Sequence, residues 1–246
     1  MDSSQLPDKS GMKELRHGMV LAAGRGERMR PISDTIPKPL IEIGGRSMLD
    51  RMLDRLERLD SVVVNAWHLP EKIAAAVSAR QKPDVTMLRE EVLLDTGGGV
   101  ANALPHLGSY VFAVANGDVL LHEPRKPALS ALAEAWDDGA MDALLLLVAR
   151  ENAGGFRGAG DFFIDTAGRL ERRGDATSAP YVYASLQLVH PRLLADAPEG
   201  AFSFNLLWDR ALEQGRLFGV VHDGGWYTVD TPANIEAAEA WLTENP

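Results

Sequence analysis

Short, continuous apolar runs alternate along the chain with longer segments whose apolar residues recur at helical spacing. The apolar runs predict strands buried on both faces of a sheet. The longer segments predict amphipathic helices, the clearest being the stripe of methionine and leucine that follows Ser47 and ends near Leu59. Strands are predicted at 17–23, 62–64, 85–88, 110–115 and 143–149, and helices at 47–59, 70–79, 97–104 and 127–137. This alternation predicts a mostly parallel sheet with right-handed crossovers.

The pattern changes after residue 150. Several glycines between 154 and 160 precede short apolar segments at 161–164, 170–172 and 181–189, which is typical of antiparallel strands. We expect residues 150–200 to form much of the second wall of a cleft. A helix at 203–214, a strand at 217–221 and a closing helix at 232–242 follow. The expected fold class is α/β, a Rossmann-like sheet flanked by helices, with a small antiparallel insertion.

Length and composition bound the organisation of the molecule. The chain has 246 residues, a net charge of −10 and no cysteine. That length favours a single domain, which we place at 17–246, preceded by a polar, flexible extension at 1–16. Without cysteine there are no disulfides, no thiolate catalysis and no cysteine-ligated zinc, whereas magnesium stays open.

Charge and hydropathy also exclude some partners. The chain has an acidic net charge and no basic tract, so it lacks the positive surface charge that is typical of nucleic-acid-binding proteins. No apolar run approaches the roughly 18–20 residues that span a bilayer, and the start lacks the pattern of a signal peptide. We therefore expect a cytoplasmic protein without a membrane or nucleic-acid partner, as a monomer or a small homo-oligomer.

The segment from Gly24 to Arg46 has a net positive charge, whereas the whole chain is acidic. It holds five basic residues (Arg25, Arg28, Arg30, Lys38 and Arg46) against three acidic ones (Glu27, Asp34 and Glu42). The predicted strand at 17–23 runs directly into the glycine-rich loop with which this segment begins. Such a loop presents backbone N–H groups and cations to an anion, so the segment predicts a phosphate site.

Two other interpretations of this loop remain open. A dinucleotide fold also places glycines after its first strand, but Met29 stands where its fingerprint needs a third glycine. No acidic residue ends an obvious second strand to bind a ribose, which also disfavours a dehydrogenase. The second interpretation is a surface turn whose arginines are merely solvated.

Five motifs, in order, carry a resemblance to a known family. They are Leu21-Ala22-Ala23-Gly24-x-Gly26-x-Arg28-Met29, Pro37-Lys38-Pro39, Thr96-Gly97-Gly98-Gly99, Asn116-Gly117-Asp118 and Trp226-Tyr227-Thr228-Val229-Asp230-Thr231-Pro232. From about Met19 onward the chain resembles the sugar-1-phosphate nucleotidylyltransferases. The resemblance implies the nucleotide-diphospho-sugar transferase fold, with a nucleoside triphosphate and a sugar 1-phosphate as substrates. The reaction would form a nucleotide sugar and release pyrophosphate.

The resemblance also implies roles for individual residues. Arg28 and Lys38 would be catalytic by neutralising phosphate charge, and Asp118 and Asp230 would hold Mg²⁺. The implied nucleotide-binding residues are Leu21, Ala22, Ala23, Gly24, Gly26, Glu27, Arg28, Lys38, Thr96, Gly97 and Gly98. Open alternatives are a solvated Lys38, an ordinary turn aspartate at 118 and a helix N-cap at 230. No general base is required, because the second pKa of a phosphate monoester is about 6.

The acceptor sugar is less clearly indicated. Segments at 158–162, 183–187 and 202–210 are most similar to the short bacterial members that activate N-acetylmuramic acid 1-phosphate with UTP, in cell-wall recycling. The implied sugar-binding residues are Asn116, Asp161, Ser185 and Asp230, with Ser185 standing where the family commonly has glycine. Alternatives are a guanylyl- or thymidylyltransferase acting on mannose, glucose or heptose 1-phosphate, and a non-catalytic nucleotide-sugar-binding subunit.

Overall fold

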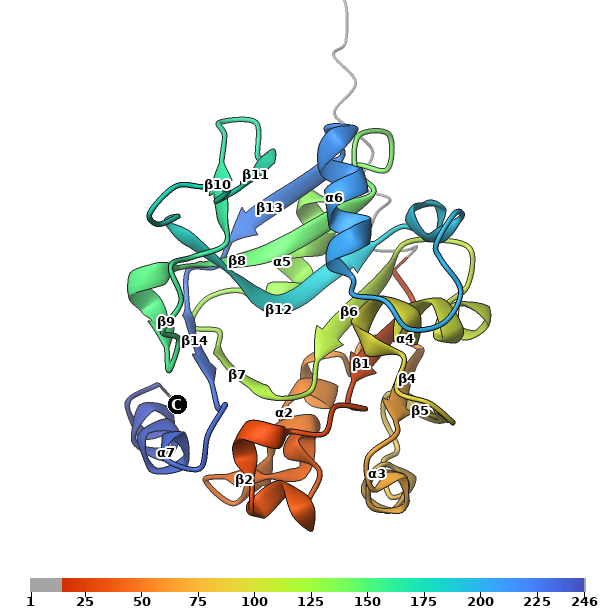
Figure 1. Ribbon diagram of the computed structural model, residues 1–246, viewed down its shortest axis with the longest axis vertical. Helices are drawn as coiled ribbons and strands as arrows, with labels where there is room; N and C mark the ends of the chain where they lie inside the picture. Colours follow the sequence, from red (N-terminus) through yellow and green to blue (C-terminus); the bar gives the residue numbers. More distant parts are fainter. Residues whose placement is uncertain (1–14, 246) are drawn as a thin grey trace, which may run out of the picture.

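A nine-stranded sheet forms the centre of the molecule (Figure 1). The computed structural model describes residues 15–245. Seven strands follow one another across the sheet in the order β11 (Leu170–Arg172), β10 (Phe162–Ile164), β12 (Tyr181–Val189), β6 (Phe112–Asn116), β1 (His17–Leu21), β4 (Ser61–Ala66) and β5 (Asp84–Arg89). β8 (Ala143–Ala149) pairs with β12, and β13 (Leu217–Val221) pairs with β8.

Strand direction confirms the predicted mostly parallel sheet. β5, β4, β1 and β6 pair in parallel, as do β8 and β13. β12 lies antiparallel to both β6 and β8, so it is a reversed strand between two parallel groups. β10 and β11 are the antiparallel strands predicted after residue 160, and they extend one edge of the same sheet.

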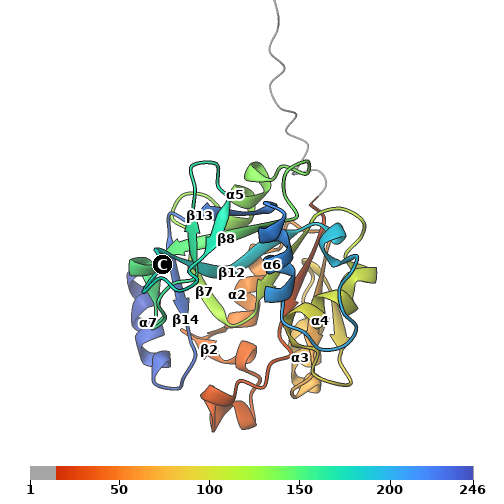
Figure 2. The same ribbon diagram turned by 45° about the horizontal axis from the view of Figure 1, so that its top comes forward.

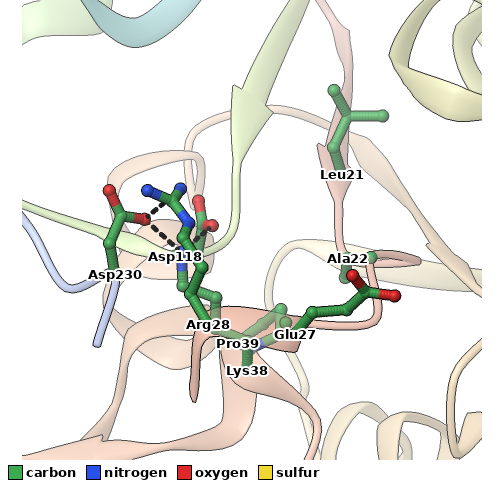
Figure 3. A pocket seen from close by; sticks show the side chains of 10 residues that line it. Leu21, Ala22, Glu27, Arg28, Lys38, Pro39, Asp118 and Asp230 are labelled. Carbon is green, nitrogen blue, oxygen red and sulfur yellow. Dashed lines mark hydrogen bonds and ion pairs between the residues drawn. The ribbon is translucent and has the colours of Figure 1, made fainter. Parts of the chain in front are cut away.

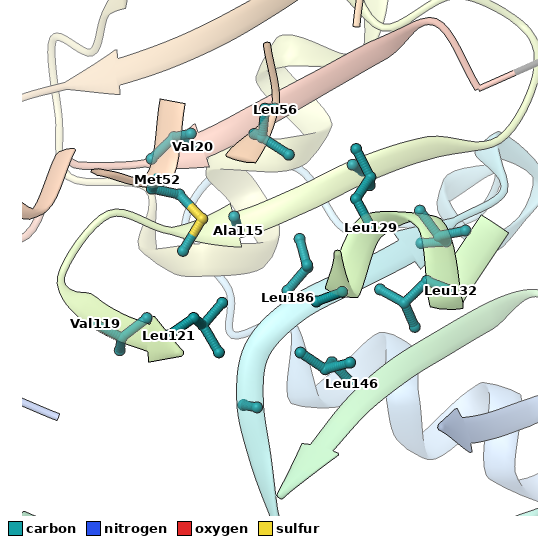
Figure 4. Packing of buried hydrophobic residues seen from close by; sticks show 14 of the residues in the cluster. Val20, Met52, Leu56, Ala115, Val119, Leu121, Leu129, Leu132, Leu146 and Leu186 are labelled. Carbon is teal, nitrogen blue, oxygen red and sulfur yellow. The ribbon is translucent and has the colours of Figure 1, made fainter. Parts of the chain in front are cut away.

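Helices cover both faces of this sheet because alternate strand residues point to opposite sides. On one face, Val20, Val64 and Ala115 pack with the apolar stripes of α2 (Met48–Arg55), α3 (Pro70–Ser78) and α5 (Ala128–Ala135). Figure 4 shows part of this cluster. On the other face, Met19 and Val114 pack with α4 (Asp95–Ala103) and α6 (Asn205–Glu213). Within residues 15–245, none of the helices has the length and hydropathy that crossing a membrane requires.

A second, three-stranded sheet lies beside the first. It contains β7 (Val119–His122), β14 (Gly225–Thr228) and β9 (Ala153–Gly154). The last helix, α7 (Asn234–Glu244), packs on β14, and β2 (Glu42–Ile43) forms a short hairpin with β3 (Arg46–Ser47). The hydrophobic pattern predicts none of these strands, which are two to four residues long.

The predicted N-terminal extension at 1–16 mostly lies outside the described residues. Of its last two residues, Leu15 is buried in the cluster that holds Val20. The carbonyl of Arg16 accepts a hydrogen bond of 2.8 Å from the backbone N–H of Asp60. The chain is therefore packed against the sheet before β1 begins.

The carboxyl ends of β1, β4 and β6 meet at one edge of the sheet. In two views, α7 and β14 lie on one side of this edge, and α3 and α4 lie on the other (Figures 1 and 2). The loops that follow the parallel strands therefore converge between these two groups of elements. Open α/β sheets bind their ligands at such an edge.

Candidate active site

The glycine-rich loop after β1 lines a cavity of about 350 Å³ (Figure 3). Gly26 has φ +61°, and a Cβ at this position would approach Lys38 Cβ to 3.0 Å. A short 3-10 helix, Glu27–Met29, follows and is anchored by Met29, which is fully buried. The cavity is lined by Leu21, Ala22, Gly24, Gly26, Glu27, Arg28, Lys38, Pro39, Asp118 and Asp230. The structure therefore brings the predicted phosphate loop, both predicted cations and both predicted metal ligands to one place.

Lys38 joins the two aspartates at the bottom of this cavity (Figure 3). Its Nζ lies 2.7 Å from Asp118 Oδ2 and 2.8 Å from Asp230 Oδ1. The side chains come from distant segments: Lys38 begins a 3-10 helix, Asp118 lies between β6 and β7, and Asp230 follows β14. Arg28 Nη2 reaches the same oxygen of Asp230 at 3.1 Å.

Burial and charge have opposite effects on this cluster. Burial disfavours the charged form of Lys38, but attraction to Asp118 and hydrogen bonds to both aspartates outweigh it, so its pKa is raised above its ordinary value. Burial likewise works against ionisation of Asp230, but hydrogen bonding and attraction to Lys38 dominate, so the pKa of Asp230 is lowered. Lys38 is therefore a permanent cation and Asp230 a permanent anion near neutral pH.

The cations differ in freedom. The Lys38 side chain is 11% exposed and held on two sides, whereas the Arg28 side chain is 72% exposed. A buried, oriented ammonium can stabilise charge at a fixed position, while an exposed guanidinium can follow a group that moves. The site thus contains one buried cation held on two sides and one exposed cation.

The donor set fits magnesium held jointly with a substrate. No group of three or more His, Cys, Asp or Glu side chains suited to a metal occurs in the part of the chain that the structure describes. Asp118 and Asp230 face each other across Lys38, and each has a second carboxylate oxygen that Lys38 does not contact. Magnesium is commonly bound by one or two carboxylates together with substrate phosphates. The two aspartates therefore suit Mg²⁺ that arrives with a nucleotide.

A second cavity, of about 370 Å³ and mostly apolar in lining, opens beside the loop on the α4 side. Its lining residues are Leu21, Ala23, Gly24, Asn65, Leu93, Asp95, Thr96, Asn116 and Asp118. Asp95 has φ +58°, and its side chain accepts a hydrogen bond of 2.6 Å from the backbone N–H of Thr96. The size and apolar walls of this cavity suit the flat ring of a nucleobase.

Two buried residues that the sequence reasoning missed link this cavity to the phosphate loop. Asn65 Oδ1 accepts a hydrogen bond of 2.8 Å from the backbone N–H of Ala22, and Asn65 Nδ2 donates one of 2.7 Å to Glu90 Oε1. Glu90 Oε2 accepts a further hydrogen bond of 3.1 Å from the backbone N–H of Leu94. Asn65 could have been found as the polar residue in an otherwise apolar strand, whereas nothing marks Glu90.

Gly97 and Gly98 line none of these cavities. Their backbone N–H groups both donate to the carbonyl of Phe202, at 2.9 and 3.1 Å. A Cβ on Gly97 would lie 2.3 Å from the Phe202 ring, and one on Gly98 would lie 2.3 Å from the carbonyl oxygen of Gly200. The close approach that these glycines permit is to the 200–202 segment. Their contact with a nucleotide stays a prediction, whereas Thr96 lines the second cavity.

A third cavity, of about 420 Å³, lies between β12, α6 and β14. It contains all four predicted sugar-binding residues, Asn116, Asp161, Ser185 and Asp230. Asp161 Oδ2 also accepts a hydrogen bond of 2.9 Å from the backbone N–H of Tyr183, so part of its role is to hold β12. Ser185 has φ +65°, a backbone conformation that favours glycine, and its Oγ lies 3.4 Å from Asn116 Nδ2.

The three cavities share wall residues. Leu21 lines all of them, Asp118 lines the first and second, and Asp230 lines the first and third. The first cavity, which Lys38 lines, therefore has one wall in common with the apolar cavity and another in common with the third cavity. This arrangement suits a reaction between two phosphorylated substrates, one entering from each side.

Comparisons with known proteins agree with this geometry. A sequence profile of the MobA-like NTP transferase domain matches residues 18–196. The chain is 38% identical over 233 residues to N-acetylmuramate alpha-1-phosphate uridylyltransferase of Caulobacter vibrioides, covering 92% of this chain and 96% of that protein. It is 31% identical over 230 residues to the protein of the same name from Neisseria meningitidis serogroup B, covering 90% and 96% respectively.

Solved structures share the fold at lower identity. The crystal structure of HddC from Yersinia pseudotuberculosis complexed with GMP-PN has a TM-score of 0.73 at 20% identity, covering 93% of this chain and 100% of that one. UDP-glucose pyrophosphorylase complexed with UDP-glucose has a TM-score of 0.74 at 14% identity, covering 94% and 99%. These likenesses confirm the predicted fold class.

Proposed function

The chain belongs to the MobA-like NTP transferase family, and on that premise we propose that it transfers a uridylyl group from UTP to N-acetylmuramic acid 1-phosphate. The products would be pyrophosphate and the corresponding nucleotide sugar. The observation that carries the proposal is the Lys38–Asp118–Asp230 cluster, whose aspartates line the first cavity together with one or the other of its two neighbours. The base and the sugar are taken from the two relatives that match along nearly their whole length.

The proposed reaction forms one P–O bond and breaks another. A phosphate oxygen of the sugar 1-phosphate attacks the α-phosphorus of UTP, and the bond from that phosphorus to the pyrophosphate oxygen breaks. The attacking phosphate is largely a dianion at neutral pH, because its second pKa is about 6, so no proton has to be removed. The protein's task is then to align two anions and offset their repulsion.

Lys38 supports this task from a fixed position. Two of its three N–H donors point to Asp118 and Asp230, which leaves the third for a phosphate oxygen. We propose that Lys38 stabilises negative charge that develops at the α-phosphate and that Arg28 follows the departing pyrophosphate. The backbone N–H groups of the loop around Gly24 and Gly26 add further donors.

Asp118 and Asp230 would hold Mg²⁺ in this proposal. The ion, when bound, supplies positive charge that neutralises phosphate oxygens and helps to orient them. Asp230 borders both the first cavity, which we call the phosphate cavity, and the third, which we call the acceptor cavity, so its carboxylate lies where either substrate can be served. Because the donor is a nucleoside triphosphate, we place the reaction in the cytoplasm, in the reuse of cell-wall sugars.

Pyrophosphate release by the purified protein with Mg²⁺ tests the proposal. The grid would combine UTP, GTP, dTTP and CTP with the 1-phosphates of N-acetylmuramic acid, N-acetylglucosamine, glucose, mannose and heptose. We expect the highest rate for UTP with N-acetylmuramic acid 1-phosphate. A higher rate for another pair would show that the substrates are different while the type of reaction is as proposed. A folded protein without turnover on any pair would favour a nucleotide-sugar-binding subunit.

A matched pair of aspartate variants tests the metal site. Asp118→Asn should abolish Mg²⁺-dependent turnover, because it removes a carboxylate that faces Lys38. Asp84→Asn, at an exposed position at the start of β5, should leave turnover unchanged. Equal activity of the two variants would remove Asp118 from the metal site.

A further inference from the structure

The acceptor cavity has a single positive charge among its lining residues. Asp95, Asp161 and Asp230 contribute carboxylates to the cavity wall, and Arg172 contributes a guanidinium. Asp230 also borders the phosphate cavity, so the phosphate end of an acceptor belongs there. Arg172 lies on β11, at the edge of the main sheet, and does not line the phosphate cavity. Among the described residues that line this cavity, Arg172 is therefore the cation that a second anionic group on the acceptor would meet.

The guanidinium of Arg172 is held in place by its neighbours. Its Nε and Nη2 donate to Asp209 Oδ1 at 3.0 and 2.7 Å, and Nη2 donates to Asn205 Oδ1 at 2.9 Å. The guanidinium carbon lies 5.1 Å from the ring centre of Phe162 and 5.6 Å from that of Trp208. Hydrogen bonds donated to residues of α6 and contacts with two rings thus orient the group before any ligand binds.

One edge of this guanidinium remains available. Among residues 15–245, no hydrogen bond from Arg172 Nη1 is found, so its two N–H groups are not used by the protein. The Arg172 side chain lines the acceptor cavity and is 32% exposed, so it can be reached by a ligand there. Its ion-pair partner Asp209 is 56% exposed, and an exposed pair of this kind is screened by water. Asp209 therefore offsets the charge of Arg172 only in part.

We propose that Arg172 binds the carboxylate of the acceptor and thereby selects an acidic sugar over its neutral counterpart. This inference rests on the proposed function. N-acetylmuramic acid is N-acetylglucosamine that carries a lactyl ether, and the carboxylate of that ether is its only anionic group besides the phosphate. A guanidinium matches a carboxylate in charge and planar geometry, and such charge-assisted hydrogen bonds are among the strongest in proteins.

Product affinity isolates this contact from the rate of the reaction. The experiment would measure, by titration calorimetry with Mg²⁺, the binding of UDP-N-acetylmuramic acid and UDP-N-acetylglucosamine to the wild type and to Arg172→Met. We expect the wild type to bind the acidic nucleotide sugar more tightly. Arg172→Met should lose roughly 10- to 100-fold in affinity for that ligand, as expected for one hydrogen-bonded charge pair. Its affinity for the neutral ligand should stay within about threefold.

The adjacent Arg173 provides the matched control. Arg173 Nη1 donates to the carbonyl of Ala176, and the residue does not line the acceptor cavity. Arg173→Met should therefore keep the wild-type preference for the acidic ligand. If Arg172→Met does not fold, Arg172→Lys keeps the charge but removes the planar fork, and it should lose part of the preference while binding the neutral ligand normally.

Several outcomes would overturn the inference. An equal loss of affinity for both ligands in Arg172→Met would show that Arg172 only supports the cavity wall through Trp208 and α6. An unchanged preference would place the carboxylate elsewhere, and equal binding of both ligands by the wild type would show that no carboxylate subsite exists. In each case, pyrophosphate release from UTP and N-acetylmuramic acid 1-phosphate by the wild type would leave the proposed function intact. If the wild type showed no turnover and bound neither ligand, the proposed function and the inference would both be overturned.

Discussion

At the scale of single residues, Lys38 organises the candidate site because its ammonium contacts both Asp118 and Asp230. Lys38→Met keeps most of the side-chain volume but leaves two facing carboxylates without their shared cation. We expect kcat/KM to fall at least about 100-fold, or 2–3 kcal/mol of transition-state stabilisation. Steady-state kinetics with saturating Mg²⁺ measures this loss.

Lys126→Met is the control for Lys38→Met. Lys126 is half-exposed, pairs with Glu134 and lines none of the three cavities of the site. Its kinetics should match those of the wild type. If Lys38→Met retained wild-type kcat/KM, charge neutralisation by Lys38 would have to be abandoned.

Ser185, in the wall of the acceptor cavity, has a strained backbone conformation. It is a buried residue with φ +65° at the irregularity where the pairing of β12 with β8 shifts register. A left-handed conformation costs a non-glycine residue about 1–2 kcal/mol, and glycine at this position would remove that cost. Glycine also has a larger conformational entropy in the unfolded chain, which cancels part of this stabilisation. Ser185→Gly should therefore raise the free energy of unfolding by about 0.5–1 kcal/mol.

Urea denaturation measures this change, with Ala184→Gly as the neighbouring control. Ala184 is fully buried in the same strand and has no positive φ, so glycine should destabilise the protein there. Destabilisation by both substitutions would mean that the Ser185 hydroxyl, 3.4 Å from Asn116 Nδ2, outweighs its backbone strain.

Two glycines predicted to serve the nucleotide have separable roles. Gly24→Ala adds a methyl group with no atom within 4 Å, so the free energy of unfolding should change by less than about 0.5 kcal/mol. The methyl group would stand in the phosphate cavity and should weaken UTP binding about tenfold. Gly97→Ala places its methyl group against Phe202 and should cost about 1–3 kcal/mol of stability.

Denaturation and UTP titration on both variants would separate the two roles. Gly97→Ala should bind UTP normally under conditions where it is folded. A stable Gly97→Ala variant with impaired nucleotide binding would instead support the prediction that this glycine contacts the nucleotide.

At the scale of elements, the long buried strands are predictable from the sequence, whereas the strands of the second sheet are not. The apolar runs that form β1, β6 and β8 are five to seven residues long and buried on both faces, so they stand out from the polar sequence around them. β14 is marked in the sequence only by a motif, because its burial depends on packing against α7 rather than on a pattern within the strand. α4 begins at Asp95, two residues earlier than predicted, and the backbone N–H groups of Gly97 and Gly98 in its first turn donate to the carbonyl of Phe202, a partner that the local sequence does not indicate.

His190 gives one connecting element a pH dependence. Its Nδ1 accepts a hydrogen bond of 3.0 Å from the backbone N–H of Arg192 and caps the 3-10 helix Pro191–Leu194. Burial, followed by repulsion from Arg192, lowers the pKa of His190. The unfolded chain therefore binds a proton more readily than the folded one, and the stabilisation present above the ordinary pKa of 6.5 is lost as the pH falls below it.

His190→Asn keeps a capping acceptor but does not titrate. The free energy of unfolding of the wild type should fall more steeply than that of His190→Asn as the pH is lowered from about 7.5 to 5.5. Urea denaturation across this range measures the difference, to which the other histidines contribute equally in both proteins. Parallel curves would show that His190 does not couple folding to pH.

At the scale of the whole molecule, the sequence predicts which residues meet but not how the cavities connect. The motifs around Gly24, Lys38, Asp118 and Asp230 converge because the loops at the carboxyl edge of the sheet come together with the segment after β14. The link from Ala22 through Asn65 to Glu90 was not predictable, because it depends on side chains from separate strands meeting in the interior. The same holds for Arg172, which reaches the acceptor cavity only through the pairing of β10 and β11 and the position of α6.

We propose that the cluster of Lys38, Asp118 and Asp230 joins a uridylyl group to a sugar 1-phosphate. Phosphorus NMR of the wild type with Mg²⁺, UTP and N-acetylmuramic acid 1-phosphate identifies both products of this reaction. We expect loss of the UTP and sugar phosphate signals and the appearance of equal amounts of pyrophosphate and a new diphosphate diester. Unchanged substrate signals with folded protein, or release of inorganic phosphate without a diester, would show that the cluster does not perform this transfer.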